Sequence, residues 1–407
     1  MPTPLLIGLL REGRTPPDRR VALTPKKCVE LQEAYPGRVQ VRVQPSPDRA
    51  FSDQEYRDLG IEVAEGLAAC DVLLGVKEVA VHDLIPHKIY LFFSHTIKQQ
   101  PRNRDLLRAV LDKDITLIDY ELLTNAQGER VVAFGYWAGV VGAYNGLLTY
   151  GRKHGLYTLR PAWQCVDLED MEEEFFKVRR LPPIKIAVTG SGRVAQGAVE
   201  VLGRMGIRRV GVYDYLYLDF NEPVYTQLRS SDYNRRADGR VWDTPNFHQE
   251  PRAYESTFGK YLPVTDLLIA CAYWDPAAPR LFAAADTQRP DFKLDTIADV
   301  TCDVDGSIPL TQRSTTIEEP AFDYDPASGQ LVVPYSGADH VTVMAVDNLP
   351  CELPRNASRD FGRQLLDEVF PHLLAGDPAG VLARATIASG GQLQPRFQYL
   401  AGYASGS

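Results

Sequence analysis

The chain has 407 residues, of which 44% are hydrophobic and 24% charged, and its formal net charge is −9. This length and composition favour a globular protein of two domains with sizeable cores. No basic tract is long enough to line a nucleic-acid groove, and no apolar run approaches the roughly 20 residues that span a bilayer. We therefore expect neither a nucleic-acid partner nor a membrane-spanning segment.

Six cysteines are scattered along the chain without a Cys-x-x-Cys pair. In a chain of this length, such spacing is typical of reduced thiols in a cytoplasmic protein, not of a disulfide framework or a zinc site. The acidic stretch that begins at Asp299 lacks the spacing and the closing glutamate of a calcium-binding EF-hand. No metal site is predicted.

Residues 5–10 are expected to form a first strand, because their apolar patch lacks the basic start and the cleavage site of a signal peptide. The loop that follows carries Arg11, Arg14, Arg19 and Arg20. Such a cluster is either a solvated charged loop or a guanidinium clamp for a substrate carboxylate, which planar arginine suits well.

Three apolar segments, each typical of a strand, end in side chains that can bind or catalyse. DVLLGVK ends in Lys77, IYLFFSH ends in His95, and ITLIDYE ends in Glu121. In open α/β sheets the ligand crevice lies beyond the carboxyl ends of the strands, so neighbouring strands would bring these side chains to one rim. Each residue alone is more often solvated or structural, but the coincidence of three favours a site. Lys98, in the loop after His95, can add positive charge.

The strongest pattern lies between residues 183 and 214. A short apolar run ends in Gly190-x-Gly192, an amphipathic helical pattern follows, and a second apolar run at 210–213 ends in Asp214. Strand, glycine turn, helix, strand and acid form the arrangement that binds a dinucleotide. The alternative is an ordinary strand–helix–strand unit with a flexible turn. The flanking strands and the terminal acid favour the dinucleotide-binding interpretation over this alternative.

The glycines would let backbone N–H groups approach a pyrophosphate, and the helix N-terminus at Arg193 and Val194 would favour its negative charge. Asp214 is placed to accept hydrogen bonds from both ribose hydroxyls and to repel a 2′-phosphate. The expected cofactor is therefore NAD, with NADP still possible.

Other segments supply the remaining expectations. A helix rich in small residues should follow Phe134, pack closely against a neighbour and bridge two domains. Residues 215–261 are too long for an ordinary connection, so they form a functional excursion or a mobile loop. Strands are expected at 265–273 and 295–303, and the tail after Ala388 is expected to fray.

Short motifs, in order across nearly the whole chain, resemble the alanine dehydrogenase and saccharopine dehydrogenase group. They are RRVALTP, GVKE, SHTIK, LIDYE, RVVAFGYWAGVVG, YWDPAAPRLF, ADVTCDVDGSI, TTIEEPAFDYD and VDNLPCELP. Within the group, the chain is most similar to lysine-forming saccharopine dehydrogenases and to the lysine–ketoglutarate reductase domain of the bifunctional animal and plant enzyme. YWDPAAPRLF, DVDGSI and TTIEEP favour the reductase branch, whereas the glycine turn resembles that of the NAD-using enzymes.

The resemblance implies an α/β fold of two Rossmann-like domains with parallel sheets and an inter-domain active-site cleft. Residues 1–134 and 350–407 would form the outer, catalytic domain, and residues 135–349 the dinucleotide-binding domain. The implied function is an oxidoreductase of saccharopine dehydrogenase type, with reversible hydride transfer between NAD(P) and saccharopine that interconverts it with L-lysine and 2-oxoglutarate. The alternatives are an alanine-dehydrogenase-like amino-acid dehydrogenase and an inactive NAD-binding regulatory protein.

The resemblance also assigns residues of the substrate site. The acid–base pair of the family falls on Lys77 and His95, and its substrate-binding arginine falls on Arg20. Glu78 and Glu121 match acids that tune that site. General acid–base work near neutral pH suits histidine, and a lysine whose pKa is lowered by nearby positive charge can share it.

The resemblance places further residues at the cofactor. Asp303 matches an aspartate near the nicotinamide, and Asn348 and Leu349 match a backbone segment that lines the nicotinamide pocket. The resemblance implies a small amino-acid or keto-acid substrate as partner. A homo-oligomer is a further expectation, although the sequence does not fix the oligomeric state.

Overall fold

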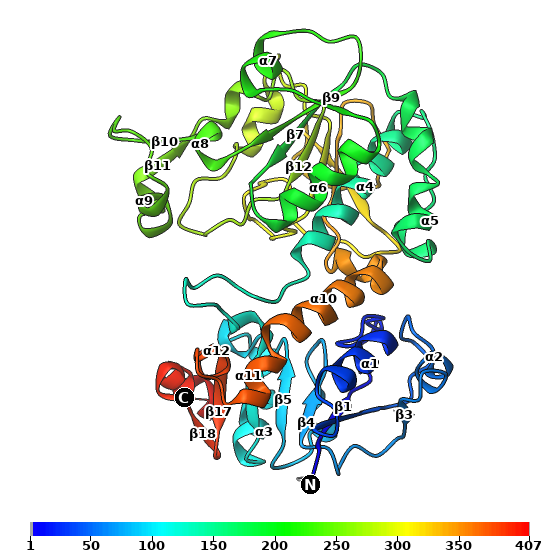
Figure 1. Cartoon of the computed structure of the whole chain (residues 1–407). Coiled ribbons are helices and arrows are strands. Elements are labelled where there is room, and N and C mark those ends of the chain that lie inside the picture. Colours follow the sequence, from blue (N-terminus) through cyan, green and yellow to red (C-terminus); the bar gives the residue numbers. More distant parts are fainter. Residues whose placement is uncertain (1–2, 407) are drawn as a thin grey trace. The chain divides into compact units, whose positions relative to one another are not determined.

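The computed structural model describes residues 3–406, which divide into two compact units. The first unit is the chain up to Phe134 together with the chain from Pro354 onward, and the second is Gly135–Leu353 (Figure 1). Each unit contains an eight-stranded sheet in which most neighbours are parallel and helices lie against the faces. The predicted α/β class with two Rossmann-like domains is confirmed. No helix among the described residues combines the length and apolarity needed to cross a membrane.

The sheet of the first unit has the strand order β18-β17-β6-β5-β4-β1-β2-β3. Its parallel strands are β1 (Leu5–Leu9), β2 (Val39–Val43), β3 (Glu62–Val63), β4 (Val72–Leu74), β5 (Ile89–Phe92) and β6 (Thr116–Asp119), and its antiparallel strands are β17 (Thr386–Ser389) and β18 (Gln392–Leu393). Its α-helices are α1 (Pro25–Ala34), α2 (Asp53–Arg57), α3 (Arg104–Asp112), α10 (Pro354–Glu368), α11 (Phe370–Ala375), α12 (Val381–Ala385) and α13 (Ala401–Ser405).

Local sequence explains how this unit is built. β4 and β5 read as short continuous apolar runs because parallel strands are covered on both faces. α1 begins where Thr24 caps the backbone N–H of Lys27 and Pro25 occupies the first helical position. The expectation that the tail after Ala388 frays is wrong: its apolar residues, such as Phe397 and Leu400, pack into the core beneath β6 and β17.

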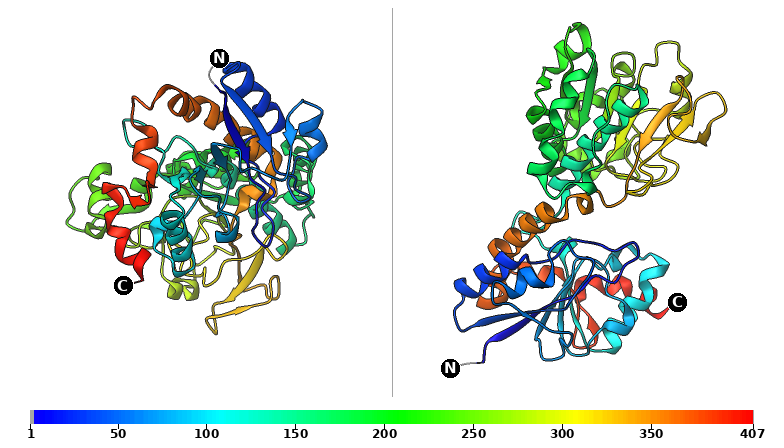
Figure 2. Two further views of the ribbon diagram at one scale, coloured as in Figure 1. Left: turned by 90° about the horizontal axis from the view of Figure 1, so that it is seen from below. Right: turned by 90° about the vertical axis from the view of Figure 1, so that its right-hand side faces the viewer.

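The sheet of the second unit has the order β15-β14-β16-β13-β12-β7-β9-β8. These strands are β7 (Lys185–Thr189), β8 (Arg208–Arg209), β9 (Val224–Leu228), β12 (Leu267–Ala270), β13 (Thr296–Asp299), β14 (Ala321–Asp325), β15 (Gln330–Val332) and β16 (Val341–Met344). The α-helices of this unit are α4 (Gly135–Lys153), α5 (Leu168–Glu172), α6 (Arg193–Arg204), α7 (Val212–Tyr217), α8 (Ser230–Tyr233) and α9 (Thr244–Gln249). β14 and β15 form an antiparallel hairpin that projects at the edge of the unit in Figure 2.

One predicted strand of the second unit is wrong. Residues 210–213 do not form a strand: β8 ends at Arg209, and Val212–Tyr217 is the helix α7. The side chain of Tyr215 is fully buried and bonds Thr265 Oγ1 at 2.9 Å, which holds α7 against the sheet. A short apolar run can bury itself as a helix or as a strand, and its periodicity does not distinguish the two. The strand beside β7 is instead β9.

The 215–261 excursion is largely structured. It contributes β9 to the sheet and then forms a small hairpin of β10 (Asn234–Arg236) and β11 (Tyr254–Ser256), with α9 beside it (Figure 1). Trp242, Phe247 and Tyr254 pack together with ring centroids 4.9 to 5.2 Å apart. This aromatic cluster gives the excursion a core of its own.

The small-residue helix predicted after Phe134 is α4, and it packs against α6 as expected. The two backbones approach so closely that a Cβ on Gly197 would lie 2.1 Å from the carbonyl oxygen of Tyr136. This contact holds the helix that follows the glycine turn against the longest helix of the unit.

Replacing Gly197 by alanine is therefore expected to force α6 away from α4 and to lower the free energy of unfolding by about 1–3 kcal/mol. Gly203→Ala is the matched control, because a Cβ added to Gly203 on the same helix would have nothing within 4 Å. That control should be neutral or stabilising by up to about 1 kcal/mol. Thermal melts followed by circular dichroism measure both, and equal midpoints would contradict the close approach.

Candidate active site and dinucleotide pocket

A pocket of about 200 Å³ lies in the first unit beyond the carboxyl ends of neighbouring strands. The strands β1, β4, β5 and β6 are consecutive neighbours and all run parallel. The pocket is lined by Arg20, Lys77, Phe93, His95, Glu121, Arg130 and Phe134. The expectation that the three strand ends are neighbours is thus confirmed, and four residues predicted for the substrate site line one cavity.

Asp119, the last residue of β6, forms hydrogen bonds with both loops that carry His95 and Glu121. Its Oδ2 accepts hydrogen bonds from the backbone N–H of Ser94 at 3.1 Å and from the Ser94 hydroxyl at 2.5 Å. Its Oδ1 accepts one from the backbone N–H of Glu121 at 2.8 Å. Complete burial raises the pKa of Asp119, and the bonds from Ser94 and from the Glu121 backbone oppose the rise. Asp119 positions both side chains without lining the pocket itself.

His95 is oriented by Glu78. The His95 Nδ1 lies 2.6 Å from Glu78 Oε1, and the ring stacks on Phe93. Burial raises the pKa of Glu78, but the hydrogen bond from His95, a backbone hydrogen bond and the charges of His95 and Arg14 lower it to about 2. Because an ionised carboxylate only accepts, Nδ1 must donate, which leaves Nε2 to exchange protons with a ligand.

Glu12 is a site residue that was not predicted from the sequence. Its carboxyl oxygens accept hydrogen bonds from the backbone N–H groups of Val76 at 2.7 Å and Lys77 at 2.8 Å. Burial, followed by the charge of Asp18, raises its pKa to about 8. Glu12 follows the end of β1 in the same way that Lys77 follows the end of β4. Its position after a strand could have identified it, but the arginines around it made the loop look basic.

Arg20 is held rigidly at the pocket wall. Its Nε and Nη2 donate to the two carboxylate oxygens of Asp18 at 3.0 and 2.6 Å, and its guanidinium lies 4.2 Å from the ring centre of Phe134. Burial raises the pKa of Asp18, but the charge and hydrogen bonds of Arg20 hold it well below its usual range. Of the other loop arginines, Arg11 pairs with Glu65 and Arg14 with Glu78. Arg19 is exposed, and of the four loop arginines Arg20 alone lines the pocket, so Arg20 is the candidate to bind a substrate carboxylate.

Two carboxylate oxygens beside the pocket have unused hydrogen-bonding capacity. Within the described part of the chain, Glu78 Oε2 and Glu121 Oε2 are buried without a hydrogen-bond partner. Lys98 lies 3.4 Å from Glu121 Oε1 but does not line the pocket. Arg130, which opens the RVVAFGYW motif and was not singled out, lines it. Two guanidinium groups and Glu121 line this small cavity, and Glu78 lies behind His95, so the surroundings suit a ligand with carboxylate and ammonium groups.

A pocket of about 360 Å³ surrounds the glycine turn of the second unit. Gly190, Gly192, Arg193 and Val194 all line it, as predicted for the cofactor site. Gly190 has φ +97°, a conformation open to glycine, and its N–H donates to the carbonyl of Leu228 at 2.8 Å. Glycine backbone at the start of the twelve-residue helix α6 fits a pyrophosphate, because N–H groups and the helix dipole both favour an anion there.

Four other predicted cofactor residues do not line this pocket: Asp214, Asp303, Asn348 and Leu349. Asp214 lies exposed on α7, and because β9 stands between β7 and β8, the reason for placing it at a ribose no longer holds. The excursion and the YWDP motif supply the wall instead, through Ser230, Tyr233, Asn234, Phe247, His248, Pro251, Tyr273, Trp274 and Asp275. The pairing of β9 with β7 brings the excursion to the pocket. Because this pairing joins distant segments, the spacing of residues in the sequence did not predict it.

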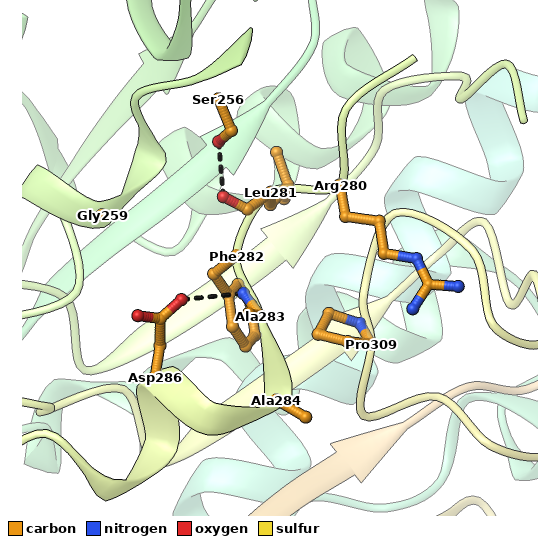
Figure 3. Close-up of a pocket in the computed structure, with 9 residues that line it drawn as sticks. All are labelled: Ser256, Gly259, Arg280, Leu281, Phe282, Ala283, Ala284, Asp286 and Pro309. Carbon is orange, nitrogen blue, oxygen red and sulfur yellow. Dashed lines mark hydrogen bonds between the residues drawn. The ribbon is translucent and has the colours of Figure 1, made fainter. Parts of the chain in front are cut away.

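A larger, open pocket of about 530 Å³ adjoins the glycine-turn pocket, and Leu281 lines both. Figure 3 shows that Ser256 and Asp286 point toward backbone atoms of its own wall: Ser256 Oγ donates to the Leu281 carbonyl at 2.6 Å, and Asp286 accepts from the Ala283 N–H at 2.8 Å. Arg280 donates to the Asp305 carbonyl at 2.8 Å. The polar side chains of the larger pocket therefore already have backbone partners. The glycine-turn pocket is the better candidate for an anionic ligand.

The raised pKa of Glu12 predicts how stability depends on pH. Its carboxyl keeps a proton up to about pH 8 in the folded state but loses it near 4.5 when unfolded. The folded state therefore binds more protons across this window, so stability should fall as the pH rises from about 4.5 to about 8. Glu12→Gln should flatten the decline of the thermal midpoint over this range, whereas the exposed control Glu33→Gln should not. Parallel profiles for wild type and Glu12→Gln would contradict the assignment.

Known proteins share this fold. Residues 8–141 match the alanine dehydrogenase/PNT N-terminal domain. An L-alanine dehydrogenase structure aligns with 97% of this chain and 99% of its own at a TM-score of 0.65 and 18% identity. A transhydrogenase from Sinorhizobium meliloti aligns with 96% of this chain and all of its own at a TM-score of 0.56 and 13% identity. At these identities the likeness concerns the fold.

Sequence relatives are more specific. Alpha-aminoadipic semialdehyde synthase from Mus musculus is 31% identical over 97% of this chain, and the Arabidopsis thaliana protein of that name is 29% identical over 97%. This chain spans only 47% and 41% of those proteins. The L-lysine-forming saccharopine dehydrogenase of Neurospora crassa is 26% identical over 87% of both chains. The motifs, the relatives and the fold agree that this chain is similar to proteins of the alanine dehydrogenase and saccharopine dehydrogenase group, and residues 8–141 carry the domain match.

Proposed function

We propose that the chain is an oxidoreductase of the L-lysine-forming saccharopine dehydrogenase type. It would transfer a hydride reversibly between NAD(P) and saccharopine, interconverting saccharopine with L-lysine and 2-oxoglutarate. The observation that carries the proposal is the convergence of Lys77, His95 and Arg20 on one cavity, in a chain that also has a glycine-turn pocket. Because the two pockets belong to different units, this function requires both.

The chemistry of the reaction matches these side chains. Formation of saccharopine joins the amine of lysine to the keto carbon as a carbinolamine, expels water to give an imine, and adds a hydride, which the bound cofactor supplies. The reverse direction hydrolyses the imine. Proton donors and acceptors are needed at each of these steps, and His95, with Nδ1 committed to Glu78, can accept or donate at Nε2. Lys77 would act as the second acid–base group.

Charge complementarity supports the substrate class. 2-Oxoglutarate is a dicarboxylate, and two guanidinium groups, those of Arg20 and Arg130, line the pocket. An ammonium group would find the buried oxygens of Glu78 and Glu121, which lack hydrogen-bond partners among the described residues. A keto acid would place carboxylates near these guanidinium groups, and the ammonium group of an amino acid would provide a partner for the two carboxylate oxygens.

A substrate panel tests the function directly. Lysine with 2-oxoglutarate is compared with pyruvate and ammonia, each with NADH and with NADPH, and oxidation of the nucleotide is followed by absorbance. Turnover of the first pair is expected. Turnover of the second pair alone would replace the proposal by an alanine-dehydrogenase-like activity, and nucleotide binding without any turnover would indicate a regulatory protein.

Loss of either acid–base group should abolish most of the activity. Lys77→Met and His95→Gln are each expected to lower turnover about 10²- to 10⁴-fold, the usual contribution of general acid–base catalysis. Lys26→Met and His82→Gln are the controls, because both residues are exposed and neither lines the pocket. Steady-state rates at saturating substrate measure the effect, and wild-type turnover in Lys77→Met or His95→Gln would remove that residue from the mechanism.

For the nucleotide, we propose that the residues after β9 select NADP over NAD. β9 lies directly beside β7, with Leu228 opposite Thr189, so Arg229 and Ser230 follow the strand end nearest to the glycine turn. An arginine at this strand end accommodates a 2′-phosphate. The acid at this end, Asp232, accepts the backbone N–H of Arg229 at 2.7 Å, so its carboxylate is engaged by the backbone.

Arg229→Ala should therefore raise the KM for NADPH by about tenfold or more and leave the KM for NADH nearly unchanged, because only the phosphate loses a charged partner. Neither arginine lines the glycine-turn pocket, but Arg229 directly follows the strand end beside the glycine turn, whereas Arg240 is 78% exposed and lies beyond β10, so Arg240→Ala is the matched control. Asp214→Gly should not change the preference. A loss of NADH affinity in Asp214→Gly, with no effect in Arg229→Ala, would restore the interpretation of Asp214 as the ribose ligand.

A further inference from the structure

A third cavity, of about 230 Å³, lies in the second unit and takes no part in the proposed reaction. One wall is a face of α4 that carries Asn145, Leu148, Thr149 and Arg152, spaced three and four residues apart. Most of α4 is buried and apolar or small, so three polar side chains on one face of it are unusual. The other walls are Pro161, Trp163, Gln164, Ile317, Glu318, Pro320 and Glu352.

Glu352 places a buried carboxyl group in this cavity. It is 2% exposed, and its Oε1 accepts a hydrogen bond from Asn145 Nδ2 at 2.8 Å. Burial raises the pKa of Glu352 to about 8, against the hydrogen bonds from Asn145 and from the backbone N–H of Trp163, and the charge of Glu318 adds to the rise. A carboxyl in this setting is stabilised as an anion once a positively charged group is placed beside it.

Thr149 and Arg152 provide a complementary pair of groups. Thr149 is fully buried, and its Oγ1 has no hydrogen-bond partner among the described residues. Arg152 is half-buried and forms no ion pair with any carboxylate of residues 3–406. The hydroxyl of Tyr335 lies beside both Arg152 and Thr149 and also lacks a well-formed hydrogen bond. Unpaired buried polar atoms are rare in folded proteins, and here they share a cavity with a guanidinium group.

We propose that this cavity binds a free α-amino acid with a small apolar side chain. Its carboxylate would bind Arg152 and Thr149, and its ammonium group would lie at Glu352. Leu148, Ile317 and the two prolines offer an apolar surface for the side chain. The cavity is smaller than the roughly 300 Å³ at which pockets for drug-sized ligands begin, as a single amino acid requires. The site is separate from the Lys77–His95 pocket, so it stands or falls independently of the proposed reaction.

Isothermal titration calorimetry of the full chain with L-leucine tests the site, because leucine is not a substrate of the proposed reaction. Isoamylamine and isocaproate, which are leucine without its carboxylate and without its amine, are titrated in parallel. Saturable binding of leucine is expected, at least tenfold tighter than either analogue. Because an ammonium group favours ionised Glu352, leucine binding near pH 7 should release a proton, measured as a binding enthalpy that depends on the buffer.

Three variants assign the binding to this cavity. Arg152→Met and Glu352→Gln should each weaken leucine binding about 10- to 100-fold, as expected for loss of a charged hydrogen-bonding partner. Thr149→Val should weaken it less, and Glu352→Gln should also abolish the proton release. Arg179→Met and Glu169→Gln are matched exposed controls on the same unit and should bind as wild type.

The proposal is overturned if leucine does not bind at millimolar concentration, if either analogue binds as tightly as leucine, or if Glu352→Gln binds as wild type. If circular dichroism shows that Arg152→Met does not fold, the proposal is still tested by the titrations of leucine and its two analogues into the wild-type protein. The Glu352→Gln variant tests it as well. Turnover with lysine and 2-oxoglutarate, measured separately, keeps a failure of this site distinct from a failure of the proposed enzyme.

Discussion

Two carboxyl groups that accept backbone hydrogen bonds, those of Asp119 and Glu12, hold together the loops around the pocket of the first unit. The ends of four neighbouring parallel strands bring side chains near one another, but strand ends continue into loops that need separate fixing. Asp119 fixes the loops after β5 and β6, and Glu12 fixes the loop after β4. Asp119 is fully buried and Glu12 is partly buried, and backbone N–H groups satisfy carboxyl oxygens of both.

In this arrangement, the residues that fix the loops differ from the residues that face the cavity. Asp119 and Glu12 determine where the loops lie, whereas His95, Lys77 and Arg20 face the cavity. The Glu78–His95 hydrogen bond adds a third element, since it selects the imidazole nitrogen that faces the ligand. A pocket built in this way keeps its geometry before a ligand binds, which under the proposed function reduces the reorganisation that the reaction requires.

In the second unit, too, a pocket lies at the carboxyl end of a central parallel strand, but the strand order differs. The glycine turn after β7 and the start of α6 provide a pocket for an anion, while α4 packs on α6 through Gly197. Insertion of β9 beside β7 moves the short strand β8 to the sheet edge and brings the excursion to the pocket. Several residues that line the glycine-turn pocket therefore come from a segment that resembled a loop in the sequence.

The sequence by itself determined the elements whose signals are local. Apolar runs that end in Lys77, His95 and Glu121 predicted strand ends at a rim, and glycine spacing predicted a phosphate-binding turn, because backbone preference and burial pattern act over a few residues. Only the tertiary structure decided which strand lies beside β7, and so whether Asp214 or Arg229 stands near that turn. Pairing between strands far apart in the chain depends on the packing of whole faces, as the burial of Tyr215 illustrates, and a one-dimensional pattern does not encode that choice. Contacts such as those of Glu12 and the polar face of α4 belong to the same class, since their partners are distant in sequence and only folding brings them within hydrogen-bonding distance.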